Sequence, residues 1–128
     1  MNFDQCPCSG KSLERFLRPL VLALLATEKS HGYDLAYKLA GLEIFHDSGP
    51  DISSVYKTLR VMEKEGLVQS ELDSRSGGPA KRCYVLTPDG KQCLRVWIDT
   101  LRKYRVRLDR LLDVLNDSFK PGKRRNSL

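Results

Sequence analysis

Cysteine and histidine are the side chains best suited to metal or redox chemistry, and the sequence has few of them. Four cysteines occupy positions 6, 8, 83 and 93, and two histidines occupy positions 31 and 46. One proline separates Cys6 from Cys8, and this spacing suits a tetrahedral metal less well than two intervening residues would. We therefore predict no metal site and no cofactor. A metal or redox sensor that uses Cys6 and Cys8 with a partner from elsewhere in the chain remains an alternative.

Catalytic patterns are also missing from the sequence. No histidine stands beside a plausible nucleophile motif, no pair of carboxylates falls in a predicted cleft, and no glycine-rich phosphate-binding loop occurs. The 128 residues suffice for one small domain with an appendage, but they are few for two cores with a cleft between them. We therefore expect a protein that is not an enzyme.

The charge balance indicates a polyanionic partner. Lysines and arginines number 22 against 16 aspartates and glutamates, which gives a formal net charge of +6 and an isoelectric point of about 9.3. Nucleic acid is the commonest partner for such a chain. The apolar run at residues 20–26 is too short to span a bilayer, and the N-terminus lacks the basic region of a signal peptide. We therefore expect a cytoplasmic protein with no membrane partner.

Short helices must position these charges. An apolar stripe at helical spacing predicts a first helix after a capping Ser12. Pro19 either kinks this helix or lies in its first turn, with the regular part starting near Arg18. Ser30 is a good N-cap for a second helix, which we expect to end near Gly41.

A third helix and a hairpin follow. Asp51 or Ser53 can cap this helix, and Gly66 ends it. Strand-like runs at residues 67–72 and 82–86, separated by a flexible turn rich in glycine and serine, predict a hairpin with a long tip. The buried face of the third helix is expected to carry Val55, Leu59 and Met62.

A long helix closes the sequence. Thr87 supplies a capping hydroxyl and Pro88 suits the first helical position, and nothing interrupts the helix until about Ser118. Its length, roughly 43 Å at about 1.5 Å per residue, exceeds what so small a domain can cover, so its apolar seam needs a second chain. This seam follows a heptad pattern through Leu94, Trp97, Leu101, Tyr104, Leu108, Leu111 and Leu115.

Three helices followed by a two-stranded hairpin are typical of a winged helix-turn-helix, so the fold class is mainly α (α+β) with a two-stranded wing and one long C-terminal dimerisation helix. In that fold the third helix enters the major groove and the hairpin tip contacts the flanking backbone. We expect an N-terminal arm at 1–11, a winged-helix DNA-binding domain at 12–87, a dimerisation helix at 88–117 and a basic flexible tail at 118–128.

Three blocks of sequence resemble the PadR-like transcriptional regulators. They are "HGYDL", "SSVYKTLRVMEKEGLV" and "GGPAKRCYVLTPDGKQCL", the last followed soon by a tryptophan, and the resemblance covers roughly residues 12–115. The opening "CPCSGKSLERFLRPLVLALL" also resembles the branch known as poly-beta-hydroxybutyrate-responsive repressors. The resemblance implies a homodimer that represses promoters and is modulated by a small molecule or a stress signal.

Candidate DNA contacts come from the third helix, the wing and two tyrosines of the family blocks. Short hydroxyls and a flexible cation at an exposed helix start can reach base edges and phosphates, whereas ordinary capping and solvation are the alternative. Cations after a glycine-rich tip can approach phosphates, or they can simply keep the hairpin soluble. His31 by itself is better interpreted as a structural histidine. The candidate DNA contacts are Tyr33, Ser53, Ser54, Tyr56, Lys57, Lys81 and Arg82.

Dimer and effector predictions concern the long helix. Trp97 is best interpreted as a packing residue of the interface, but the resemblance also makes it a candidate contact for a flat hydrophobic effector. The family resemblance favours packing of the long helix across the partner's first helix, at Phe16, Leu17 and Leu20. Two identical heads would then bind the half-sites of an inverted repeat. A dimeric winged helix that binds proteins and not DNA is an alternative, which the cations of the third helix and wing disfavour.

Overall fold

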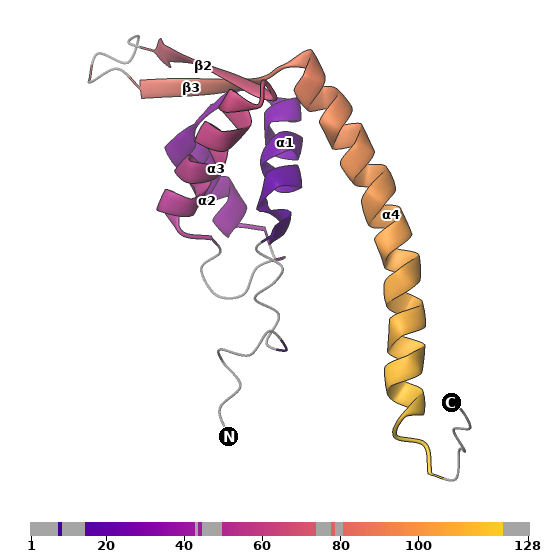
Figure 1. The fold of residues 1–128 in the computed structure, drawn as a ribbon. Helices are drawn as coiled ribbons and strands as arrows, with labels where there is room; N and C mark the ends of the chain where they lie inside the picture. Colours follow the sequence, from indigo (N-terminus) through magenta and orange to yellow (C-terminus); the bar gives the residue numbers. More distant parts are fainter. Residues whose placement is uncertain are drawn as a thin grey trace. The chain divides into compact units, whose positions relative to one another are not determined.

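Four α-helices and three short strands make up the part of the chain that the structure describes (Figure 1). The structure, a computed structural model, describes residues 8, 15–42, 44, 50–73, 78 and 81–121. The chain divides into two units, residues 1–94 and 95–128. The elements are α1 (Leu17–Thr27), β1 (Ser30–His31), α2 (Gly32–Ala40), α3 (Ile52–Lys64), β2 (Val68–Asp73), β3 (Lys81–Leu86) and α4 (Pro88–Asp117).

Helix α1 begins at Leu17, with Phe16 at the N-cap position. Pro19 therefore lies in the first turn, where its missing N–H has no partner to lose, and the second of the two alternatives for this helix is confirmed. Ser12 lies outside the described residues, and the N-cap position that we assigned to it belongs to Phe16. Leu17 is buried in the single chain, whereas Phe16 and Leu20 are half-buried.

The predicted start of the second helix is wrong by one residue. Ser30 is not an N-cap but lies buried in β1, opposite Tyr84 of β3, and its hydroxyl donates to the carbonyl of His31 at 3.2 Å. His31 is the N-cap of α2 in extended conformation, and its neighbour in β3 is Cys83. Strand pairing thus occupies the residue that propensity assigned to the helix cap. Gly41 ends α2 as expected.

Helix α3 has the boundaries that the sequence predicts. The backbone N–H of Ser54 donates to Asp51 Oδ1 at 2.9 Å, so Asp51 is the N-cap, and hydrogen bonds from Ser54 lower the pKa of the Asp51 carboxyl. Gly66 has φ +81°, a left-handed conformation that suits glycine just after a helix. The predicted buried face is confirmed by the complete burial of Val55, Leu59 and Met62.

The wing is an antiparallel pair that runs from Val68 opposite Leu86 to Asp73 opposite Lys81. Strand β1 pairs with the other side of β3, so the sheet has three strands in the order β1-β3-β2 and not two. Helices α1, α2 and α3 lie together on one side of this sheet (Figure 1). Their large buried side chains form the core, which comprises Val21, Leu22, Leu35, Leu39, Val55, Leu59, Met62 and Val68.

A hydroxyl group joins the end of α3, the wing and the start of α4. Thr87 Oγ1 lies 2.7 Å from the carbonyl oxygen of Gly66 and 3.0 Å from that of Leu67, and it accepts from the N–H of Gly90 at 3.0 Å. The Thr87 N–H donates to the Leu67 carbonyl at 3.1 Å. Thr87 therefore caps α4, with Pro88 at the first helical position, as predicted.

Helix α4 has 30 residues, about 45 Å at about 1.5 Å per residue. Its second half carries large apolar side chains that are exposed among the described residues. None of the helices in the described part of the chain is long and apolar enough to cross a membrane. The exposed large apolar residues of α4 are Val96, Ile98, Tyr104, Val106, Leu108, Leu111, Leu112, Val114 and Leu115.

The Thr87 junction predicts an unusual response to Gly90→Ala. Alanine normally stabilises a helix by up to about 1 kcal/mol relative to glycine. A Cβ on Gly90 would lie 2.1 Å from the carbonyl oxygen of Leu67, so we expect a loss of about 2 to 3 kcal/mol in the free energy of unfolding. Guanidinium titration at one fixed protomer concentration measures this loss. Gly41→Ala is the control, because its Cβ meets ordinary contact distances. Equal stability of the two variants would contradict the prediction.

Candidate nucleic-acid interface

Four of the candidate DNA contacts line a single cavity. Its volume is about 440 Å³, and we call it the wing hollow. The start of α2 contributes Tyr33, α3 contributes Tyr56, and the start of β3 contributes Lys81 and Arg82. Segments from three parts of the sequence therefore converge there. The remaining lining residues are His31, Gly32 and Asp34.

Gly32, the glycine of the "HGY" block, leaves room for the ring of Tyr56. A Cβ on Gly32 would lie 2.3 Å from Cε1 of the Tyr56 ring, so only glycine lets this ring approach the start of α2. Tyr56 is half-buried and Tyr33 is 64% exposed. The first backbone N–H groups of a helix have no partner within that helix, and here they lie beside the hollow. Gly32 thus fixes Tyr56 next to a place where an anion is favoured.

A second cavity, which we call the helix hollow, adjoins the start of α3. Its volume is about 500 Å³, and Ser54 and Lys57 are among its lining residues. Ser53 is exposed on the same helix but is not among them. The sequence analysis missed Arg15 and Arg18, which add two cations to this hollow. The complete lining comprises Arg15, Leu17, Arg18, Pro50, Asp51, Ser54, Lys57 and Thr58.

A chain of hydrogen bonds fixes Arg82 within the wing. Arg82 Nη1 donates to Ser70 Oγ at 2.9 Å. The hydroxyl and backbone N–H of Ser70 donate to Glu63 Oε2 at 2.7 and 3.1 Å. Arg82 therefore links β3 to β2 and, through Ser70, to the last turn of α3. A guanidinium group has five N–H donors, so this structural bond is compatible with a phosphate contact.

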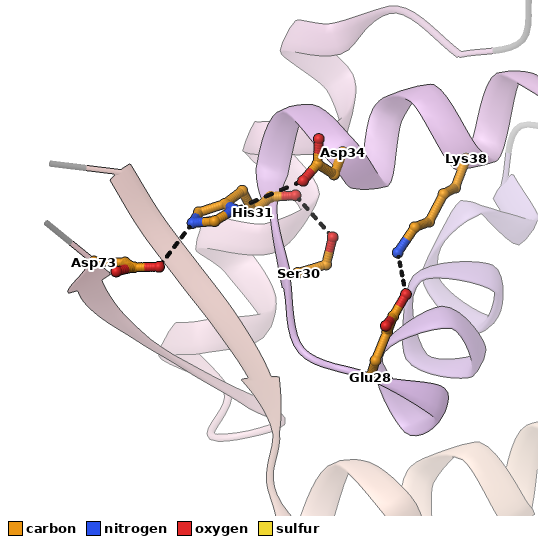
Figure 2. A network of polar contacts seen from close by, with 6 residues as sticks. All are labelled: Glu28, Ser30, His31, Asp34, Lys38 and Asp73. Carbon is orange, nitrogen blue, oxygen red and sulfur yellow. Dashed lines mark hydrogen bonds and ion pairs between the residues drawn. The ribbon is translucent and has the colours of Figure 1, made fainter. Parts of the chain in front are cut away.

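His31 joins the hollow to the far end of the wing (Figure 2). Its Nδ1 lies 3.6 Å from Asp34 Oδ2 and its Nε2 lies 3.4 Å from Asp73 Oδ2. Asp34 follows in the first turn of α2, and Asp73 is the last residue of β2. A separate ion pair, Lys38 Nζ to Glu28 Oε1 at 2.9 Å, ties α2 to the segment after α1.

The described residues give the cysteine alternative no visible support. Cys83 is buried in β3, Cys93 is half-buried in α4 and Cys8 is exposed. Cys6 and His46 lie outside the described residues. Among the described residues, no group of three histidine, cysteine, aspartate or glutamate side chains could hold a metal ion. Trp97 is half-buried on α4, and its contact with an effector stays a prediction.

Residues 21–96 match the model of the PadR-like family of transcriptional regulators. The chain belongs to the PadR-like family. Members of this family are transcription regulators and not enzymes. The predicted family and the prediction that the protein is not an enzyme are therefore confirmed. The matches do not separate the poly-beta-hydroxybutyrate-responsive branch from other members, and that branch stays a prediction.

Solved structures of PadR-like regulators share the winged-helix fold. A PadR family regulator from Eggerthella lenta is 28% identical with a TM-score of 0.66, and the match covers 88% of this chain and 93% of that one. A PadR-like regulator from Bacillus cereus is 26% identical with a TM-score of 0.66, over 78% and 94% of the two chains. Bacillus subtilis PadR, solved in complex with operator DNA, is 26% identical with a TM-score of 0.56, over 64% and 46%. No curated protein matches the sequence.

The surroundings of Tyr84 in β3 of this PadR-like protein predict that one tyrosine ionises at higher pH than the others. Burial, and then the negative charge of Glu63, raise the pKa of Tyr84 above its usual value near 10. The stability gained from the neutral phenol is therefore complete below about pH 10 and is lost as pH rises through the raised pKa. Ultraviolet titration of tyrosinate should show one of the five tyrosines ionising last.

Two variants assign that ionisation. Tyr84→Phe should remove the last step, and Glu63→Gln should move it to lower pH because it removes a nearby negative charge but keeps oxygen acceptors for Ser70. A Tyr84→Phe protein that retains the last step would show that the assignment to Tyr84 is wrong.

Proposed function

We propose that this PadR-like protein binds an inverted-repeat operator as a homodimer in the cytoplasm and represses transcription. The observation that carries the proposal is the convergence of Tyr33, Tyr56, Lys81 and Arg82 on the wing hollow, beside the exposed start of α3. Bacillus subtilis PadR, solved with operator DNA, supports this function because it shares the fold and the family.

The two hollows suit backbone phosphates, and α3 suits the major groove. Lys81 and Arg82 supply charge at the wing hollow, while Arg15 and Lys57 supply charge at the helix hollow. Phosphate contacts of this kind set the orientation of a protein on the duplex, and base contacts supply the specificity. Ser53, Ser54 and Lys57 lie exposed in the first turns of α3, where side chains of a recognition helix read base edges.

The exposed surface of α4 supports the homodimer. Four residues of the predicted heptad seam are between 42% and 56% exposed in the single chain. Side chains of this size gain free energy when a partner covers them, and a heptad pattern places them in one row. Of the three first-helix residues proposed for the interface, Phe16 and Leu20 retain more surface for a partner than Leu17, which is only 6% exposed. The four exposed seam residues are Tyr104, Leu108, Leu111 and Leu115.

A small hydrophobic effector completes the proposal. Trp97 occupies the same heptad seam, so a flat ligand that contacts its ring would change how the two helices pack. Because the spacing of two DNA-binding heads depends on the interface between them, such a change alters the fit to the operator. The proposed effector therefore acts on DNA affinity through the dimer and not by competition for the hollows.

Cations of the two hollows are expected to determine the salt dependence of DNA binding. Fluorescence anisotropy should show binding to a duplex from the region upstream of the protein's own gene. The slope of log affinity against log salt is negative, and Lys57→Ala and Lys81→Ala should each reduce its magnitude by about one. The double variant should combine both reductions. Lys103→Ala, which removes the same charge from α4, is the control.

Two outcomes would contradict the DNA contacts. If the double variant binds as tightly as the wild type, the assigned phosphate contacts are wrong. If the wild type binds no duplex at low salt, the alternative of a winged helix that binds proteins is favoured instead.

The homodimer prediction rests on the heptad seam. Leu108→Asp combined with Leu115→Asp places two carboxylates in the proposed interface, and we expect monomers in sedimentation velocity or loss of the cooperative fold. Arg102→Asp is the control because it introduces the same group on the heptad row that carries only polar residues. A double variant that sediments with the wild type would contradict this interface. The polar row consists of Arg95, Arg102, Asp109 and Asn116.

A further inference from the structure

His31 lies between two carboxylates, one at each ring nitrogen. Figure 2 shows Asp34 and Asp73 on opposite sides of the imidazole. A neutral imidazole has one N–H and one acceptor nitrogen, whereas an imidazolium presents N–H groups at both nitrogens. A carboxylate oxygen lies 3.6 Å from Nδ1 and another lies 3.4 Å from Nε2, so each N–H of an imidazolium would face an acceptor. Imidazole is the side chain whose charge ordinarily changes between pH 5 and 8.

Charged groups from every neighbouring element contribute to the balance around His31. Asp34 comes from α2 and Asp73 from β2, while Lys81 and Arg82 come from β3 and line the same hollow. Glu71 of β2 lies opposite Cys83, which pairs with His31 on its other side. His31 is also the N-cap residue of α2, at the positive end of the helix dipole. The titratable hydroxyls beside His31 in the lining of the hollow are those of Tyr33 and Tyr56.

The protonation state of His31 changes the net charge at the wall of the hollow. With a neutral imidazole, the formal charges of the two cations of β3 and of the two aspartates that pair with His31 sum to zero. An imidazolium adds one positive charge at the wall of the hollow, next to the place proposed for a phosphate. A phosphate bound there adds one negative charge and so stabilises the imidazolium in turn.

We propose that His31 takes up a proton when the wing hollow binds a DNA phosphate, so that operator affinity rises as pH falls. This inference rests on the proposed DNA-binding function and adds a residue and a regulation to it. Because linkage is reciprocal, protons raise the affinity for DNA by the same factor by which DNA raises the affinity for protons. His31 thereby acts as a positioning and charge-setting residue of the phosphate site.

The first experiment measures operator binding by anisotropy at pH 6 and pH 8 with the upstream-region duplex. Uptake of one proton changes affinity by at most tenfold per pH unit, so over the range in which imidazole titrates we expect wild-type binding about three- to tenfold tighter at pH 6. His31→Gln should lose this gain, so that its ratio of affinities between pH 6 and pH 8 falls close to one, whatever its affinity at pH 8. His46→Gln, which changes the other histidine of the chain, should retain it.

A second variant separates charge from structure. Asp73→Asn removes one negative charge from the side of His31, so we expect tighter binding than the wild type at pH 8 and a smaller ratio between pH 6 and pH 8. Loss of a purely structural contact would weaken binding at both pH values. The imidazole proton resonances of His31 provide a second readout that does not depend on measuring affinity. Addition of DNA should shift the titration of these resonances to higher pH.

The possible results distinguish the proton linkage from the DNA-binding function on which it rests. Equal pH ratios for the wild type and His31→Gln, or an unchanged His31 titration with DNA, would overturn the proton linkage while leaving DNA binding intact. Absence of wild-type binding at both pH values would overturn the proposed function itself.

Discussion

The hydroxyl of Thr87 connects more of the structure than any other single group described above. It satisfies carbonyl oxygens in the turn after α3 and the N–H of Gly90 in the first turn of α4. Four element ends therefore meet within a few residues: the end of α3, the start of β2, the end of β3 and the start of α4. Gly66 turns the chain there with a left-handed backbone, and Gly90 lets α4 approach the Leu67 carbonyl because it has no Cβ.

Local chemistry made most of the fold predictable from the sequence. Asp51, Gly66, Thr87 and Pro88 act through contacts within three or four residues, and the structure confirms all four. Helical spacing likewise identified the buried face of α3. Strand β1 could not be found in this way, because two residues are too few for an alternating pattern. Its pairing partner lies more than 50 residues away along the chain, and Ser30 was consequently interpreted as a helix cap.

The candidate site was predicted in its residue types but not in its grouping. The sequence indicated Tyr33, Tyr56, Lys81 and Arg82 one block at a time, and their convergence on a single hollow is a tertiary result. Arg15 and Arg18 lie among the apolar residues that predict the first helix, and nothing in that local pattern indicates that they border the start of α3. Two further roles depend on contacts between residues that are far apart in the sequence. Arg82 is bound to Ser70, and His31 pairs with an aspartate from the far end of β2.

The short strand β1 also limits how the sheet can meet other chains. It covers one side of β3 at Cys83 and Tyr84, and β2 covers the other, so β3 is the central strand. The outer edge of β2 is then the long edge of this sheet, and it carries the charges of Glu71 and Asp73. Charged edge strands resist the backbone pairing through which sheets of separate molecules join and aggregate. The exposed wing therefore offers other molecules little opportunity for β-aggregation.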